Sequence, residues 1–334
     1  MYAVYILLDY EPTVEGLLGM RVLVTGGAGF IGSALVDLIL SDNLKSIAHE
    51  VTVLDSLTYA GNLKNLEQCM GKRNFQFIHG SINDFPLVES LIAETDFVIN
   101  LAAETHVDRS IVSPVEFIET NINGTMMLLN AVKNNPKVRF IQVSTDEVYG
   151  SIHEGSWDEK CPLIPNSPYS ASKASADLLC YSYFKTYNLN ISITRCSNNF
   201  GPRQFPEKLI PVVIHKILNG EEIPVYGNGL NRREWIHVQD HVRGIWSVAS
   251  LGLPGEIYNI GSKNEYTNLE IVRKIISIMD ADEKLISFVE DRLGHDFRYS
   301  LNSEKIKKEF NFLPLIDFDN GLRETVEWYR TNLN

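Results

Sequence analysis

Residues 21–39 read RVLVTGGAGFIGSALVDLI, and this stretch decides the fold of the chain. An apolar run predicts a strand over 21–25, and GAGFIG at 27–32 then matches the dinucleotide-binding pattern G-x-G-x-x-G. Apolar residues next recur at helical spacing and predict one buried helix face, made of Ile31, Ala34, Leu35, Leu38 and Ile39. A glycine turn between a strand and a helix lets backbone N–H groups approach a pyrophosphate. The stretch therefore predicts a dinucleotide site.

Further β-rich runs continue the alternation of strands and helices. They span 50–55 (EVTVLD), 75–80 (FQFIHG), 97–103 (FVINLAA), 140–144 (FIQVS) and 191–196 (ISITRC). Several are apolar throughout, as expected for strands buried on both faces of a parallel sheet. The sequence predicts an α/β fold, a doubly wound parallel sheet of the Rossmann type with a smaller C-terminal substrate-binding lobe. The expected units are an N-terminal extension of no clear role (1–19), an NAD-binding domain (20–197) and mainly the substrate-binding lobe (198–334), with some segments returning to the NAD-binding domain.

Three helices are expected in the C-terminal half. The pattern predicts one at 208–219 and places its end at Gly220. Another should begin near Thr267, which forms a capping-box pair with Glu270. A last amphipathic helix is expected around 322–329.

The composition narrows the class of protein. The chain has 334 residues and a formal net charge of −12, which argues against binding to nucleic acid or to an anionic membrane surface. Its four cysteines show no metal-ligand spacing, so no metal is expected. No apolar run reaches membrane-spanning length, and a cytoplasmic location is the expectation.

Asp55 indicates which dinucleotide should bind. It ends the second predicted strand, where an acidic side chain can accept hydrogen bonds from both hydroxyls of an adenosine ribose. No Arg or Lys follows before Lys64, so nothing nearby would pair with a 2′-phosphate. The pattern therefore favours NAD over NADP.

Two polar segments are candidates for the chemistry, STDEVYG at 144–150 and SPYSASK at 167–173. Tyr169 and Lys173 are four residues apart, so on a helix they share one face. A neighbouring ammonium and a nicotinamide cation would both lower the pKa of the phenol, which makes Tyr169 a candidate base for a sugar hydroxyl. The Thr145 hydroxyl could hydrogen-bond the same oxygen.

Asp146 and Glu147 follow Thr145 directly, at the predicted carboxyl end of a parallel strand. Redox chemistry alone needs no carboxylates there. Two adjacent carboxyl groups suit paired acid and base work if their surroundings separate their pKa values.

Seven segments together carry a family resemblance. They are TGGAGFIG (25–32), LAAETHVDRS (101–110), STDEVYG (144–150), SPYSASKAS (167–175), CSNNFGPRQFPEKLIP (196–211), NRREWIHVQDH (231–241) and DRLGHD (291–296). The chain resembles the extended short-chain dehydrogenase/reductase family from Met20 to about Tyr329. Within that family it is most similar to the nucleotide-sugar 4,6-dehydratases that act on dTDP-glucose.

This resemblance implies a catalytic cycle. Tyr169, assisted by Lys173 and Thr145, would take the C4 hydroxyl proton while NAD accepts hydride from C4. Glu147 would remove the C5 proton, and Asp146 would protonate the departing C6 hydroxyl. Hydride would then return to C6 and give a 4-keto-6-deoxy sugar.

The resemblance also implies binding residues and an assembly. Residues expected at the cofactor are Gly26, Gly29, Phe30, Ile31, Gly32, Asp55, Leu57, Thr58, Ser81, Ile82, Leu101, Ala102, Ala103, Thr120, Tyr169, Lys173 and Asn199. Residues expected at the nucleotide sugar are Thr105, Thr145, Asn198, Lys208, Leu209, Pro224, Tyr226, Arg233, Asn268, Arg292 and His295. Among these, Arg233 and Arg292 suit the diphosphate because a guanidinium matches phosphate oxygens. A homodimer through the helices near 110–130 and 170–187 is the expected assembly.

Two alternatives stay open at this point. One is another nucleotide-sugar enzyme of the same family, a C4 epimerase, a decarboxylase or a GDP- or UDP-sugar dehydratase. The acidic pair Asp146-Glu147 favours a dTDP-sugar dehydratase over these. The other is a non-catalytic NAD-binding regulator, which the presence of Tyr169 and Lys173 argues against.

Overall fold

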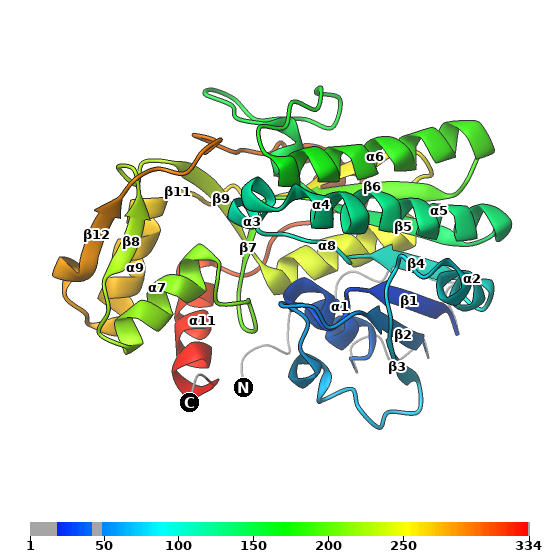
Figure 1. The fold of residues 1–334 in the computed structure, drawn as a ribbon, viewed down its shortest axis with the longest axis horizontal. Coiled ribbons are helices and arrows are strands. Elements are labelled where there is room, and N and C mark those ends of the chain that lie inside the picture. The colour runs from blue at the N-terminus through cyan, green and yellow to red at the C-terminus, as the bar shows by residue number, and fades with distance from the viewer. Residues whose placement is uncertain (1–18, 42–48, 333–334) are drawn as a thin grey trace.

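A seven-stranded parallel sheet forms the centre of the computed structural model, which describes residues 19–41 and 49–332 (Figure 1). Its strand order is β10-β6-β5-β4-β1-β2-β3. The strands are β1 (Arg21–Thr25), β2 (Glu50–Asp55), β3 (Phe75–His79), β4 (Phe97–Asn100), β5 (Arg139–Thr145), β6 (Ile191–Cys196) and β10 (Ile257–Ile260). All neighbouring pairs are parallel, so the predicted doubly wound α/β fold is confirmed.

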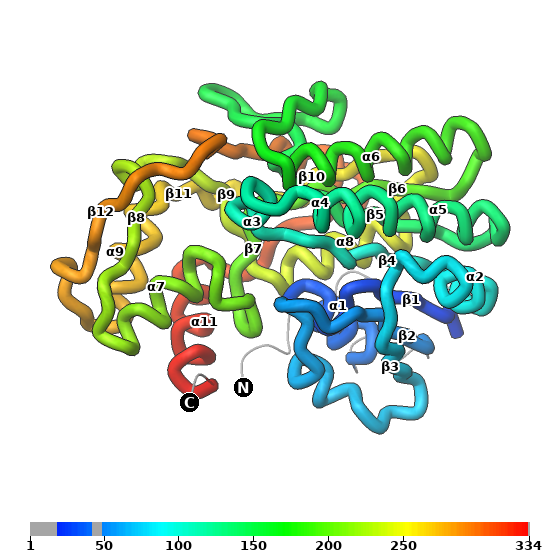
Figure 2. Tube along the Cα trace, viewed as in Figure 1, coloured from blue at the N-terminus to red at the C-terminus, as the bar shows by residue number. Residues whose placement is uncertain are grey.

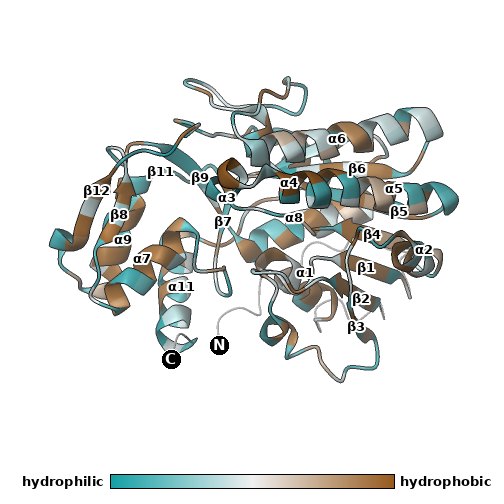
Figure 3. Ribbon diagram, viewed as in Figure 1, coloured by the Kyte–Doolittle hydropathy of each residue, from teal (hydrophilic) through white to brown (hydrophobic). Residues whose placement is uncertain are grey.

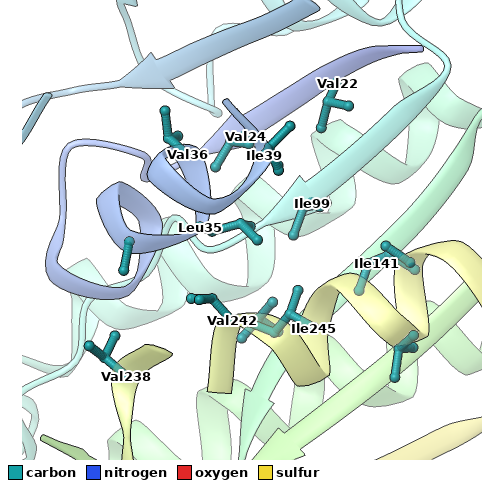
Figure 4. Close-up of a cluster of buried hydrophobic side chains, with 14 of the residues drawn as sticks. Val22, Val24, Leu35, Val36, Ile39, Ile99, Ile141, Val238, Val242 and Ile245 are labelled. Atoms are coloured by element: carbon teal, nitrogen blue, oxygen red, sulfur yellow. The ribbon is translucent and has the colours of Figure 1, made fainter. Parts of the chain in front are cut away.

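Helices cover both faces of this sheet. One face packs against α1 (Phe30–Ile39), α8 (Val238–Leu251) and α10 (Glu304–Phe310), with side chains such as Val24, Leu35 and Ile245 in the core between them (Figure 4). The other face packs against α2 (Phe85–Ala93), α5 (Thr125–Asn134) and α6 (Pro168–Tyr187). Burial on both faces explains why strands β1, β4 and β6 are nearly or wholly buried along their length.

The segment predicted as a helical region near 110–130 consists of four shorter pieces. They are α3 (Val107–Val112), α4 (Pro114–Phe117), a π-helical stretch η3 (Ile118–Gly124) and α5. Pro114 has no N–H to continue the hydrogen bonding of α3, so α4 starts at that residue. The 3-10 helices are η2 (Leu63–Leu66), η4 (Asp146–Tyr149) and η5 (Glu283–Leu285).

A smaller lobe lies beside the large sheet. It contains α7 (Leu209–Leu218), α9 (Asn268–Met279), α11 (Phe318–Asn332), the pair β8 (Ile223–Tyr226) with β12 (Ile286–Val289), and the sheet β11-β9-β7 (Glu265–Thr267, Arg232–His237, Asn198–Phe200). These elements enclose their own apolar core. In Figure 3, α11 shows mainly hydrophilic colours on its outer side, whereas strands β1 and β6 of the large sheet are hydrophobic.

The three helices predicted in this half are present. Helix α7 ends at Leu218, just before Gly220, which has a φ of +66°. Thr267 and Glu270 form the predicted capping box of α9, with each side chain accepting from the other's backbone N–H. The last helix, α11, extends beyond the predicted 322–329 at both ends.

The chain does not leave the large sheet for good after β6. It passes through the small lobe, returns as α8 and β10, leaves again for β11, α9 and β12, and returns as α10 (Figure 2). Of the N-terminal extension expected at 1–19, the first eighteen residues lie outside the described part of the chain. In the described residues, no helix has the length and apolar character needed to cross a bilayer.

Candidate active site

A cavity of about 600 Å³ opens between the carboxyl ends of the large-sheet strands and the small lobe. This is the edge at which open α/β sheets bind ligands, where the strand order reverses between β1 and β4. Residues of β5, α6, α7, β8 and β9 line the same cavity as the glycine turn after β1. The cavity therefore joins a dinucleotide half to a second half built by the small lobe.

The glycine turn lets the backbone pass close to its neighbours. Gly26 has a φ of +69°, and a Cβ there would lie 2.7 Å from the backbone N of Ala102. A Cβ at Gly32 would collide with the backbone of Gly26. Helix α1 then begins after Gly29 without a side-chain cap and without an acidic residue in its first turn. Its N-terminal N–H groups are suited to an anion.

Asp55 is held in a fixed position at the end of β2. Its Oδ2 accepts from the backbone N–H of Ala28 at 2.9 Å, and its Oδ1 accepts from that of Leu57 at 2.8 Å. Burial raises the pKa of this carboxyl, while the two backbone N–H groups favour its ionised form. The cavity wall next to it consists of Ser56, Thr58, Ala60 and Gly61, with no basic side chain among them.

With one exception, the residues predicted at the cofactor and the nucleotide sugar line this cavity. The exception is Leu57, which packs against the apolar core of the large sheet and has a φ of +49°. Its contribution is its backbone N–H, which fixes Asp55. Leu57 therefore does not line the cavity itself, and its role at the cofactor stays a prediction that would act through Asp55.

The Tyr–Lys pair lies on the cavity-facing side of α6. Ser167 caps the helix by accepting from the backbone N–H of Ser170 at 3.1 Å, and the backbone N–H of Tyr169 donates to Ser110 at 3.1 Å. Lys173 is buried, and its Nζ donates to the carbonyl of Val143 in β5 at 2.7 Å. These contacts fix the helix against the strand that carries Thr145.

The surroundings of Tyr169 in the protein alone act on the pKa of its phenol in two directions. Burial raises the pKa of Tyr169 well above its usual value, and the negative charge of Glu147 raises it further. A hydrogen bond with Thr145 acts in the opposite direction. The protein alone therefore keeps this phenol neutral, and lowering its pKa requires a positive charge brought into the cavity.

The carboxyl pair follows β5 in the short helix η4. Thr145 caps this helix, since its Oγ1 accepts from the backbone N–H of Glu147 at 3.3 Å. Asp146 is buried, its Oδ2 has no hydrogen-bond partner, and burial raises its pKa well above the usual value. Glu147 accepts from Ser170 Oγ at 3.3 Å.

The surroundings of these two carboxyl groups differ. Burial also raises the pKa of Glu147, but the positive charges of Arg292, Lys208 and Arg233 favour its ionised form. Around Asp146, burial comes first and is followed by the negative charges of Glu147 and Glu234, which raise its pKa further. Asp146 is therefore suited to be the acid of the pair and Glu147 the base.

Replacing Asp146 with Asn should stabilise the protein at neutral pH. The folded state keeps this carboxyl protonated, whereas the unfolded chain releases the proton above the ordinary Asp pKa of 3.8. The wild type therefore loses stability as the pH rises, and the Asn variant avoids this loss. We expect its free energy of unfolding to rise by at least about 1 kcal/mol at pH 7, the value of one pKa unit. Thermal unfolding from pH 4 to 8 measures it.

The matched control is Glu222→Gln, which changes an exposed carboxylate in the loop before β8, outside the cavity. This control should unfold like the wild type at every pH. For Asp146→Asn, the gain in melting temperature should shrink as the pH falls towards 4. A gain that is constant with pH would contradict the raised pKa of Asp146.

Three cations lie across the cavity from the carboxyl pair. Lys208 Nζ donates to the carbonyl of Thr105 at 2.8 Å, and burial lowers its pKa. Arg233 donates to the carbonyls of Arg232 and Asp296 and lies 4.4 Å above the ring of Tyr299. The guanidinium of Arg292 lies 3.6 Å from Asp108, and its Nε is buried without a partner.

Sequence reasoning missed several cavity residues, among them Glu104, Cys196, Glu207 and Tyr299. Three of them stand inside or beside segments that carry the family resemblance, but none has a pattern of its own. Position in the sheet could have found Glu104 and Cys196, since both lie at or just beyond the carboxyl end of a strand. Tyr299 reaches the cavity from a loop and gives no such signal.

Known proteins resemble this chain in both sequence and fold. The family model for GDP-mannose 4,6-dehydratase matches residues 23–325. A dTDP-glucose 4,6-dehydratase from Streptomyces niveus is 50% identical over 314 residues, 94% of each chain. DesIV, a dTDP-glucose 4,6-dehydratase from Streptomyces venezuelae solved with NAD bound, has a TM-score of 0.92 at 49% identity and covers 94% of this chain and 98% of its own.

The same fold also occurs in epimerases. A UDP-glucuronic acid 4-epimerase from Bacillus cereus, solved with UDP-glucuronic acid and NAD, has a TM-score of 0.88 at 28% identity. It covers 93% of this chain and 99% of its own. The overall fold therefore does not separate the two reactions, and the side chains at the carboxyl ends of the strands have to do so.

Proposed function

The chain belongs to the GDP-mannose 4,6-dehydratase family, and we propose that it converts dTDP-glucose to dTDP-4-keto-6-deoxyglucose and water. It is an NAD-dependent lyase. The choice of dTDP as the nucleotide rests on relatives that are about 50% identical to this chain, because these relatives are named dTDP-glucose 4,6-dehydratase. The observation that carries the reaction is the carboxyl pair of the buried Asp146 and the half-buried Glu147, which line the cavity together with Tyr169.

The dinucleotide half fits NAD. A Cβ at Gly26 or Gly32 would occupy the space that the turn needs, and the uncapped N-terminus of α1 suits a pyrophosphate. Asp55 retains lone pairs for the ribose hydroxyls, and its cavity wall has no cation for a 2′-phosphate. When bound, NAD accepts hydride from C4 of the sugar and returns it to C6.

The first proton transfer is assigned to Tyr169. Its phenol lies in the cavity beside Thr145, and a hydrogen bond with Thr145 favours the phenolate. Lys173, fixed on Val143, supplies the nearby ammonium on the same helix face. Tyr169 takes the C4 hydroxyl proton, and the C4–O bond becomes a carbonyl.

The elimination is assigned to the carboxyl pair. The C4 carbonyl makes the C5 proton acidic, and Glu147, which three cations favour in its ionised form, removes it. Asp146, protonated because of its burial, gives its proton to the departing C6 hydroxyl. One water leaves across C5–C6. As hydride returns to C6, Glu147 gives its proton back to C5, and the proton held by Tyr169 balances the one that Asp146 gave up.

Both parts of the chain line the cavity, so NAD and the nucleotide sugar can each be assigned to one of them. We propose that residues 20–197 hold NAD and that 198–334 mainly hold the nucleotide sugar. Lys208, Arg233 and Arg292 provide the positive charge for the diphosphate from the small lobe. Residues such as Leu209, Pro224 and Tyr226 form the neighbouring wall.

The proposed assembly is a homodimer through α4 and α6. Apolar side chains stand exposed on or next to these helices, including Val112 and Val115, 86% and 63% exposed, and Leu178, 57% exposed. Ile118 and Tyr181 continue the same series. An exposed apolar surface of this kind marks a contact with another molecule, and a two-fold axis would bury it against its own copy.

Replacing Leu178 with Arg should weaken this dimer. A charge in the centre of an apolar contact is buried without a partner, which raises the dissociation constant by about 100-fold or more. Light scattering at several protein concentrations measures the mass. The control is Leu253→Arg, since Leu253 is equally exposed, at 60%, but lies after α8. A wild type that is monomeric at micromolar concentration would contradict the assembly.

The test of the reaction is the product mass after separate incubation with dTDP-glucose, UDP-glucose and GDP-mannose. Loss of one water from dTDP-glucose alone is expected. Loss of water from another sugar would keep the reaction and change the substrate. An unchanged mass with all three sugars would contradict the dehydratase and agree with an epimerase, whose product has the mass of its substrate.

A further inference from the structure

Helix α6 carries a third ionisable group beyond Tyr169 and Lys173. Asp177 follows Lys173 by four residues, so the three side chains lie along one helix face. The Asp177 side chain is 1% exposed, and its Oδ2 accepts from Arg195 Nε at 2.9 Å. Arg195 is 3% exposed in β6. Burying such a pair has a desolvation cost that its attraction does not always recover, so stability alone is a weak reason for its presence.

We propose that Asp177 is a positioning residue for the reaction: fixed by Arg195, it supplies the counter-charge that keeps Lys173 an ammonium group. The role of Asp177 is indirect, since it does not line the cavity and acts only through Lys173. The inference rests on the proposed roles of Tyr169 and Lys173.

Asp177 lies one helical turn after Lys173 on the same face of α6, and both side chains are buried, so Asp177 is the candidate counter-ion of Lys173 although the two make no direct ion pair. From α6 these groups are Tyr169, Asp177 and Cys180, from β6 they are Arg195 and Cys196, and β5 contributes only the carbonyl of Val143. Asp177 is the one carboxylate in this set. Burial lowers the pKa of Lys173, and the charge of Asp177 is the largest influence that raises it.

Arg195 is needed because Asp177 is itself buried. Burial raises the pKa of Asp177, and the charge of Arg195 is the first influence that lowers it. Without Arg195, Asp177 would take up a proton and leave Lys173 without a counter-ion. The three side chains therefore carry a positive, a negative and a positive charge in the order Arg195, Asp177, Lys173. Arg195 keeps Asp177 ionised, and Asp177 keeps Lys173 protonated.

The same arginine also contacts the last residue of η4, the helix that carries the carboxyl pair. Its guanidinium lies 4.7 Å from the ring centre of Tyr149, and the Tyr149 hydroxyl donates to Asn259 Oδ1 at 2.9 Å. Tyr149 ends helix η4, which begins with Asp146 and Glu147. Arg195 thus contacts both the helix that carries the redox pair and the helix that carries the carboxyl pair.

The experiment follows Lys173 directly. In protein with ¹³C-labelled lysine, the NMR signal absent from Lys173→Met identifies Lys173, and its titration midpoint is read in wild type and Asp177→Asn with NAD bound. We expect the midpoint to move to lower pH in Asp177→Asn. NADH formation in a single turnover at neutral pH should slow by about 10- to 100-fold. In the pH profile of this single-turnover rate, the acidic limb should move to higher pH, because a neutral Lys173 no longer favours the phenolate of Tyr169.

Asp240→Asn is the matched control. Asp240 is equally buried and pairs with Arg243 at 3.0 Å on α8, outside the cavity. This variant should lose stability without moving the titration midpoint of Lys173 or the pH profile of single-turnover NADH formation. Asp177→Glu keeps a carboxylate and should recover part of the wild-type midpoint and part of the wild-type pH profile. If Asp177→Asn does not fold, Arg195→Lys gives the same test with a smaller shift in the same direction.

Two outcomes would overturn the proposal. One is a folded variant whose Lys173 midpoint is unchanged, and the other is a moved midpoint with an unchanged pH profile. The midpoint needs no turnover. A wild type that is inactive on every sugar would therefore refute the proposed function while leaving the Lys173–Asp177 coupling to be read independently.

Discussion

Replacing Glu147 with Gln should leave the oxidation of C4 in place and stop exchange of the C5 proton with solvent. The amide keeps the size of the side chain and can still accept from Ser170, but it cannot take a proton. Overall turnover should fall by about 10²- to 10⁴-fold, the usual contribution of a positioned base. Single-turnover NADH absorbance and mass uptake in deuterated water separate the two steps.

The control for this variant is Glu159→Gln. Glu159 is partly buried and accepts from the backbone N–H of Asn259 at 2.9 Å, away from the cavity. It should turn over like the wild type. If Glu147→Gln still exchanges the C5 proton at the normal rate, the base has to be sought among the other carboxyl groups of the cavity, of which Glu104 and Glu207 are the candidates.

Replacing Tyr169 with Phe should remove the oxidation itself, with a loss of about 10²- to 10⁴-fold in single-turnover NADH formation. Binding of the nucleotide sugar should change little, because Lys208, Arg233 and Arg292 hold the diphosphate in the proposed site. Burial raises the pKa of Tyr169, so the wild-type rate should rise with pH as the phenolate fraction grows and be lost as the pH falls. The Phe variant should lack this limb.

Tyr183→Phe is the control on the same helix. Its hydroxyl donates to Asn130 Oδ1 at 2.8 Å, outside the cavity, so the reaction should be unaffected. Normal NADH formation by Tyr169→Phe would show that another group takes the C4 proton.

The sequence predicts the strands well where they are buried on both faces. The predicted ranges 21–25, 50–55 and 191–196 coincide with β1, β2 and β6, since β-branched residues recur along each of these ranges. The range 97–103 does not coincide with β4, which ends at Asn100. Its last three residues, Leu101 to Ala103, are apolar because they line the cavity.

What could not be predicted depends on contacts between distant segments. Strand β10 pairs with β6 more than sixty positions away, and no local pattern marks it as part of the large sheet. The Asp177–Arg195 pair joins a helix to a strand 18 residues apart in sequence. The burial that raises the pKa of Tyr169 likewise depends on packing between distant segments, and the spacing of Tyr169 and Lys173 carries no sign of it.

The repeated passage of the chain between the large sheet and the small lobe has a consequence for modularity. If the chain were divided after Cys196, the large sheet would lose strand β10 and its covering helix α8. If it were divided after Ile260, the large sheet would still lose its covering helix α10. The half proposed to bind the sugar therefore cannot be exchanged as a single cassette between enzymes of different donor specificity. Such a change has to proceed by substitutions within the cavity wall, where β8, α7 and the loop at Arg292 each present a few side chains on a shared frame.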